Sequence, residues 1–95
     1  MGEVSTIVIA GLDLWFNSSD HGPPHFHARR PDHWEIRVYI ASTTRKKLVF
    51  SSKWPRNGVK VPGRLRRLLR QATATNREAL LAEWEAKVLV VEDRR

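Results

Sequence analysis

The stretch Trp34 to Ile40, WEIRVYI, decides the fold of this chain. Its apolar residues occupy every second position, and Glu35, Arg37 and Tyr39 fill the positions between them. Side chains alternate between the two faces of a strand, so this pattern is typical of a strand with one buried and one polar face. Such a strand needs partner strands and an apolar layer over its buried face. Both must come from the sequence on either side.

The segments before this strand predict further strands. Thr6 to Ile9 and Leu12 to Phe16 are short apolar runs with Gly11 between them, which predicts an N-terminal β-hairpin. His25 to Arg30 could form a third strand, and Pro31-Asp32 is a turn signal that would join it to the central strand. On the other side, Lys47 to Ser51 could add one more strand. The breakers between residues 52 and 63 then predict a loop.

After Pro62 the apolar period changes to three and four residues, which predicts an amphipathic helix from about 63 to 88. A break near Thr75 is the alternative, with Thr75 and Glu78 as a capping box. We favour one helix, because it keeps the apolar stripe in phase. Residues 89 to 91 would be the helix end or a terminal strand. The stripe consists of Leu65, Leu68, Leu69, Ala72, Ala79, Leu80, Trp84 and Val88.

Together these elements predict one α+β domain over residues 1–95. It would consist of a small antiparallel sheet of about four or five strands, beginning with the N-terminal hairpin and covered by one long or broken C-terminal helix. No run of about 18 apolar residues or signal-peptide pattern is present, and the chain has no cysteine. We therefore expect a cytoplasmic protein without disulfides.

The charges of the chain are unevenly distributed. The sequence has 17 Lys and Arg against 10 Asp and Glu, a formal net charge of +7. Residues 36 to 77 contain twelve Lys or Arg and no Asp or Glu. Such a block should attract a polyanion, and nucleic acid is the partner that it favours. Two alternatives stay open: an acidic protein partner, or a solvated basic face. The acidic stretch from 78 to 93 could also pair with the basic block of a second copy in a homodimer.

Nucleic-acid binding would rest on phosphate contacts and base stacking. Trp54 is the tryptophan most expected to be exposed, and Tyr39 is a second stacking candidate. Trp15, Trp34 and Trp84 are expected in the core. No helix-turn-helix pattern is present to support groove recognition. The predicted contact residues are Arg45, Lys46, Lys47, Lys53, Trp54, Arg56, Lys60, Arg64, Arg66, Arg67 and Arg70.

Three histidines, His21, His25 and His27, lie within seven residues. His25 and His27 should project to the same side of an extended segment. With Asp20 nearby, the three imidazoles could hold a divalent, Zn-type metal with one open position. Alternatively, His21, His25 or His27 could transfer protons in a metal-free ribonuclease, with Arg29 stabilising the phosphate. The interpretation favoured over both is that the histidines are structural.

The chain resembles a family of small bacterial proteins, the domain of unknown function 4160, over roughly residues 5 to 88. The matching residues are Thr6-Ile7-Val8, Phe16, Asp20 to His27 (DHGPPHFH), Asn76 to Leu81 (NREALL) and Trp84. The histidine-proline motif is the specific part.

Two features depart from the family pattern. Gly22 stands where the family often has a further proline, and the segment from Thr43 to Lys60 is unusually long and basic. The resemblance implies the fold outline and a bacterial cytoplasmic setting. It also implies an operon-encoded partner in a two-gene, toxin–antitoxin-like module, and it supplies no reaction. From the sequence we therefore expect a nucleic-acid-binding component of such a module. A histidine-dependent ribonuclease and a subunit that binds only protein are the alternatives.

Overall fold

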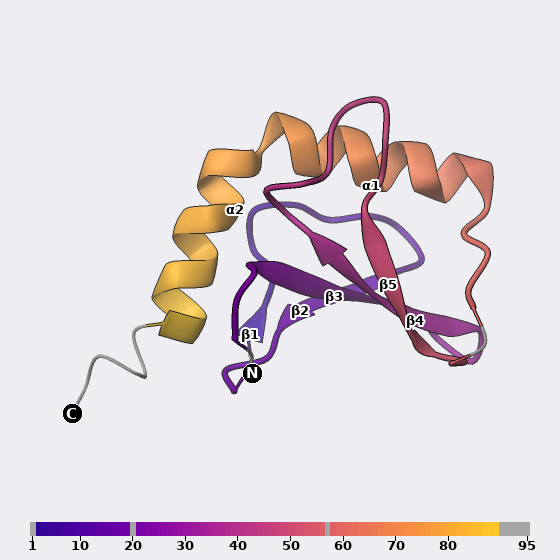
Figure 1. Ribbon diagram of the computed structural model, residues 1–95, viewed down its shortest axis with the longest axis horizontal. Coiled ribbons are helices and arrows are strands. Elements are labelled where there is room, and N and C mark those ends of the chain that lie inside the picture. Colours follow the sequence, from indigo (N-terminus) through magenta and orange to yellow (C-terminus); the bar gives the residue numbers. More distant parts are fainter. Residues whose placement is uncertain (1, 20, 57, 90–95) are drawn as a thin grey trace.

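The computed structural model describes residues 2–19, 21–56 and 58–89, and this part of the chain forms one antiparallel sheet of five strands in the order β1-β2-β3-β4-β5. Two α-helices and a short π-helix follow the sheet (Figure 1). The elements are β1 (Gly2–Glu3), β2 (Asp13–Phe16), β3 (His25–Arg30), β4 (Trp34–Tyr39), β5 (Phe50–Trp54), α1 (Gly63–Thr75), α2 (Arg77–Trp84) and η1 (Glu85–Leu89).

The alternation predicted for β4 is confirmed. Trp34, Ile36, Val38 and Ile40 are buried, and the three residues between them are half-buried. The predicted third strand is β3, and its turn to β4 places Asp32 at φ 66°, in the left-handed region that Asp tolerates. Apolar residues of the helices join the buried face of the sheet in one core cluster: Leu65, Leu69, Leu80, Trp84 and Val88.

The predicted N-terminal hairpin is wrong in its first strand. Residues 6 to 9 form no strand, and β1 lies beside β2 instead. The amide of Val4 still donates to the carbonyl of Leu14 (3.0 Å), and the chain then leaves the sheet as a loop that turns back at Gly11, with φ 88°. We refer to residues 4–12 as the N-terminal loop.

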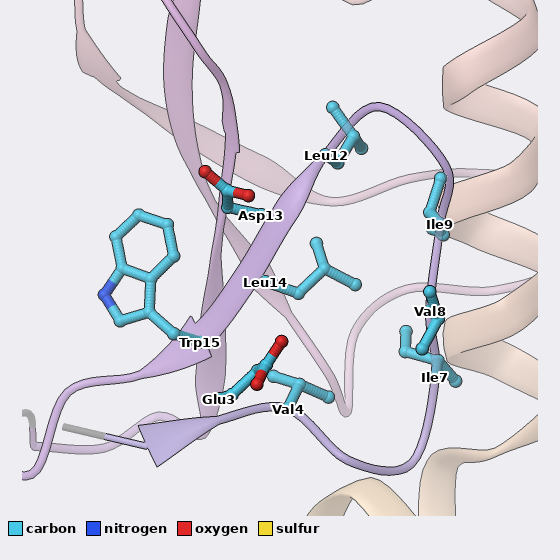
Figure 2. Close-up of a pocket in the computed structure, with 9 residues that line it drawn as sticks. All are labelled: Glu3, Val4, Ile7, Val8, Ile9, Leu12, Asp13, Leu14 and Trp15. Atoms are coloured by element: carbon cyan, nitrogen blue, oxygen red, sulfur yellow. The ribbon is translucent and has the colours of Figure 1, made fainter.

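The N-terminal loop contributes to the core although it is not a strand. Ile7 and Ile9 are buried, whereas Val8 between them is 88 % exposed. Figure 2 shows this part of the loop beside the helices. Alternate burial of this kind is what extended backbone produces, because successive side chains point to opposite sides. The apolar run in the sequence could not identify the backbone hydrogen-bond partner, because β1 occupies the position next to β2.

The favoured single helix is also wrong, since α1 and α2 are separate and meet at Asn76, with φ −110° and ψ 25°. Figure 1 shows α2 turning away from α1 beside one end of the sheet. The side-chain amide of Asn76 donates to the carbonyl of Ala72 (2.9 Å), which also accepts from the backbone N–H of Asn76 (3.1 Å). Asparagine has a low helix propensity because its side chain makes such local backbone hydrogen bonds. The predicted Thr75–Glu78 capping box is absent here: Asn76 is the N-cap of α2, and no side chain caps it.

The predicted apolar stripe and the predicted end of the helix differ in how they compare with the structure. Leu68 and Ala79 of the predicted stripe are exposed, since the buried residues are Leu65, Leu69 and Thr73 in α1 and Leu80 and Trp84 in α2. Leu89 ends η1, so the first residue of the predicted helix end or strand is helical. Residues 90 and 91 lie outside the described residues.

The last strand begins later than predicted. Thr44 and Lys47 exchange backbone hydrogen bonds of 2.8 and 3.2 Å, so residues 44–47 form a turn and β5 begins at Phe50. The strand also ends later than predicted, at Trp54, within the segment predicted as a loop. Lys53 and Trp54 therefore occupy defined positions on the sheet edge.

Candidate nucleic-acid interface

The strand register places Trp15, His27, Arg37 and Ser51 side by side across four strands. Directly opposed residues project to the same face, and this face is opposite to the core. Figure 2 shows Leu14 pointing from β2 toward the helices and Trp15 pointing away from them. We call the side that bears these four residues the open face.

Trp15 is half-buried on the open face, so its expected place in the core is wrong. Its ring stacks on His27, with centroids 5.2 Å apart and planes at 15°. Arg29 lies over the same indole, 5.3 Å from its centroid, and pairs with Asp13 at 3.1 Å. Arg29, the predicted phosphate-stabilising group, is therefore already engaged by an acid and an aromatic ring.

The two strand histidines are packed among rings. His25 is 6 % and His27 is 1 % exposed. The centroid of His25 lies 5.2 Å from that of His27, 5.7 Å from that of Tyr39 and 5.4 Å from that of Trp84. Trp84 also contacts Phe16 of the core face, so it closes the end of the sheet. Both imidazoles fill space between β3 and its neighbours.

A hydrogen bond orients the His25 imidazole, whereas His27 lies near a carboxylate at more than hydrogen-bond distance. The Nδ1 of His25 lies 2.9 Å from the carbonyl of Pro23, which can only accept, so this nitrogen carries the proton. The Nδ1 of His27 lies 3.6 Å from Glu35 Oε2, and the same oxygen lies 3.3 Å from Lys53 Nζ. A histidine–carboxylate–lysine chain therefore runs from the centre of the open face to the β5 edge.

The structure brings together two of the three predicted metal ligands. His25 and His27 are neighbours, whereas His21 is exposed on the preceding loop. Within residues 2–19, 21–56 and 58–89, no group of three His, Cys, Asp or Glu side chains is placed to hold a metal ion. Asp20, the further ligand considered, lies outside the described residues. The arrangement favours packing over coordination.

An open, polar cleft lies where β4 meets the end of β5. Arg37, Ser52, Lys53 and Arg56 line it, and its volume is about 560 Å³. Lys53 and Arg56 were predicted as nucleic-acid contacts, and the structure places them together. Trp54 lies between them in sequence and is 52 % exposed, as predicted. We call this feature the basic cleft.

The remaining predicted contacts fall into separate groups. Arg45 accepts a hydrogen bond from Arg70 Nε through its carbonyl (2.8 Å), so the loop of residues 41–49 touches α1. Arg64 lines a smaller cleft of about 170 Å³ with Arg30. Arg66 lies four residues before Arg70, on the same flank of α1. Exposed side chains in these groups are those of Arg45, Lys46, Lys47, Lys60, Arg64, Arg66 and Arg67.

Arg37 and Ser52 were not among the predicted contacts. The alternation of β4 already placed Arg37 on the polar face, so a signal for its orientation existed. Its position beside Lys53 and Arg56 depends on the β4–β5 register, which shifts between Glu35 and Ile36. No local sequence pattern gives such a shift, because it is fixed by pairing between distant segments.

A second, apolar cleft of about 350 Å³ lies between the N-terminal loop and β2 (Figure 2). Exposed Val8 stands among its lining residues, which places this cleft far from the basic block in sequence. The lining residues are Glu3, Val4, Ile7, Val8, Ile9, Leu12, Asp13, Leu14 and Trp15.

The fold and site define a small α+β domain: a meander sheet with helices on one face, and basic and aromatic side chains on the other. A family model described as Domain of unknown function (DUF4160) matches residues 11–85, so the chain belongs to this family. No curated protein and no solved structure gave a match. None of the helices in the described residues is long and apolar enough to cross a membrane.

Proposed function

We propose that this protein binds nucleic acid through the basic surface formed by the loop before β5, the end of β5 and α1. The observation that carries this proposal is that most of the basic side chains on this surface have no carboxylate beside them. Within the described ranges, Lys53 alone among the ten predicted Lys and Arg contacts lies within 4 Å of a carboxylate. Nine of the ten are exposed, and Arg70 is half-buried. Uncompensated surface cations attract the phosphate backbone and release its counterions.

Few acidic residues lie among these cations. Residues 36 to 77, which include the loop before β5 and α1, contain no Asp or Glu, and Glu35 pairs with Lys53. Glu78, Glu83 and Glu85 belong to α2 and η1, and Glu83 is already bound by Lys87. The absence of acidic side chains from the loop and from α1 supports binding of a polyanion there.

Fluorescence anisotropy with labelled RNA and DNA oligonucleotides tests this function. We expect binding whose affinity falls at least about tenfold between about 50 and 200 mM salt. Arg67→Gln should weaken binding and lower the salt slope by about one. Arg29→Gln is the matched control, since it removes the same charge from a residue that Asp13 already neutralises. Absent or salt-insensitive binding would overturn the proposal.

The ribonuclease alternative receives less support, because His25 and His27 are too buried to touch a substrate in this conformation. The toxin–antitoxin-like module stays a prediction from the family resemblance. Co-expression with the product of the adjacent gene, followed by co-purification, is its test. A stable complex that no longer binds nucleic acid would favour the alternative in which the basic surface meets an acidic protein.

A further inference from the structure

The basic cleft gathers cations from separate parts of the chain onto one spot. Arg37 comes from β4, Lys53 from β5 and Arg56 from the segment after β5, and all three line the same opening with Ser52. Glu35 pairs with Lys53 at 3.3 Å, and among the described residues no other carboxylate lies within 4 Å of these three cations. Three cations against one carboxylate leave the cleft positive, which suits an anion.

Arg37 lies partly enclosed at this cleft. It is half-buried between its register partners His27 and Ser51, and its Nη1 lies 3.5 Å from Ser51 Oγ. That hydroxyl is in turn 3.0 Å from Tyr39 Oη. A guanidinium has five donors, so one contact to Ser51 leaves most of them available. The planar guanidinium group of Arg37 can therefore donate two parallel hydrogen bonds to the oxygens of a phosphate.

Trp54 adds a surface of a different kind beside these cations. Its register partner is Glu35, so it projects to the open face, the same face as Arg37. Positions 35 and 37 are about 7 Å apart along β4, so residue 54 lies one pair of same-face positions from Arg37, although its side chain does not line the cleft. An exposed indole beside a phosphate site can stack on the base of the adjoining nucleotide.

The geometry points to the basic cleft as a site for a backbone phosphate of single-stranded nucleic acid, with Trp54 as the stacking platform for a neighbouring base. The inference rests on the proposed function and narrows its substrate class. Bases in a duplex are stacked on one another, so only an unpaired strand can offer a base to the indole. Arg37, Lys53 and Arg56 would bind the phosphate through their positive charge. Trp54 would favour single strands over duplexes, because it stacks only on an unpaired base.

Two charge-matched double variants test the phosphate site. R37Q/R56Q removes two cations from the cleft, and R66Q/R67Q removes two from α1. In anisotropy titrations with single-stranded oligonucleotides, we expect both pairs to weaken binding, and the first pair to lose at least about tenfold more affinity than the second. Arg56→Gln alone, at an exposed position, repeats the test without disturbing half-buried Arg37. Equal losses in the two pairs would overturn the cleft and leave the proposed function standing.

Trp54 is tested by its own pair of variants. Trp54→Ala should lower the affinity for single strands roughly tenfold and leave duplex binding unchanged, whereas Trp54→Tyr should retain most of it. Equal loss of single-strand and duplex binding would overturn the stacking role.

If the unaltered protein binds neither RNA nor DNA, the proposed function is wrong. Whether the basic cleft binds an anion is then tested separately. Titration with pyrophosphate, followed by NMR of the arginine Nε–H groups, should then shift the signals of Arg37 and Arg56. Unshifted signals overturn the anion site as well.

Discussion

Glu83 of α2 holds the N-terminal loop against the helices, and replacing it with glutamine tests that role. One carboxylate oxygen accepts from the amide and hydroxyl of Thr6, at 3.0 and 2.7 Å. The other accepts from the amide of Ser5 (2.6 Å) and from Lys87 Nζ (2.5 Å). Lys87 also donates to the carbonyl of Glu3 at 2.6 Å, so the same contact group reaches β1.

The pKa of Glu83 gives the size of this effect. Burial raises the pKa, but hydrogen bonds from Lys87, Thr6 and the backbone of Ser5 and Thr6 outweigh burial and lower the pKa from 4.5 to about 2. At 1.36 kcal/mol for each pKa unit, the folded state gains about 3 kcal/mol from the ionised form. Lys87 is partly exposed and screened by solvent, so we expect about 2 to 3 kcal/mol.

The sign of the pH dependence follows from the lowered pKa. The stabilisation is present above pH 4.5, where the unfolded chain is ionised, and is lost as the pH falls from 4.5 toward 2. Glu83→Gln places an amide N–H₂ or a neutral oxygen opposite Ser5 and Lys87. It should therefore destabilise the protein by about 2 to 3 kcal/mol near pH 7 and by progressively less in acid.

Urea unfolding followed by tryptophan fluorescence measures this difference, because Trp84 is 2 % exposed in the folded state. Glu85→Gln is the control, since Glu85 is exposed on the next turn and should change stability by less than about 0.5 kcal/mol. The reasoning is refuted if Glu83→Gln costs no more than this control near pH 7. It is also refuted if the cost is the same near pH 3 as near pH 7.

Three other predictions concern packing, each measured by urea or thermal unfolding. Leu69→Ala, at a fully buried position of α1, should cost about 2 to 5 kcal/mol, and a cost below about 1 kcal/mol would contradict its place in the core. His27→Ala should cost about 2 to 3 kcal/mol, while EDTA leaves the melting temperature of the unaltered protein unchanged; a lower melting temperature in EDTA would show a bound metal. In the N-terminal loop, Ile9→Ala should cost at least about 2 kcal/mol and Val8→Asp less than about 0.5 kcal/mol, and the reverse order would show that the loop packs differently.

The N-terminal loop shows what an apolar run can predict. The run at residues 6 to 9 indicated extended backbone, but it did not show which side chains are buried: Ile7 and Ile9 are buried and Val8, equally apolar, is exposed. The run also gave the wrong secondary structure, because a strand needs a free partner edge. That edge is occupied by β1, only two residues long, whose short sequence carries no strand signal.

The helix break shows a different limit. Residues 73–76 have low helix propensity, which made a break conceivable, and the apolar stripe stayed in phase, which argued against it. The structure bends at Asn76, so that Leu80 and Trp84 pack beside the end of the sheet while Leu65 and Leu69 pack along it. Where a helix must turn to follow the core is set by the shape of the sheet, which local sequence does not contain.

The histidine motif was correctly singled out, yet its place in the fold changes its interpretation. β3 lies in the middle of the sheet, so His25 and His27 are surrounded by rings from β2, β4 and α2. A spacing of two residues predicts a shared face, but it cannot predict that Trp15 and Trp84 cover that face. The sequence therefore found the buried centre of the open face, and the accessible chemistry lies at its β5 edge.

A structural explanation of this edge competes with the functional one. An edge strand is protected from pairing with other chains by charged side chains and bulges, and Lys53 beside the register shift of β5 would serve that purpose. Edge protection does not require Arg37, which lies on β4, one strand in from the edge. Arg37→Gln therefore separates the two explanations. Protection alone predicts unchanged solubility and unchanged oligonucleotide affinity, whereas the basic cleft predicts that affinity falls while solubility is retained.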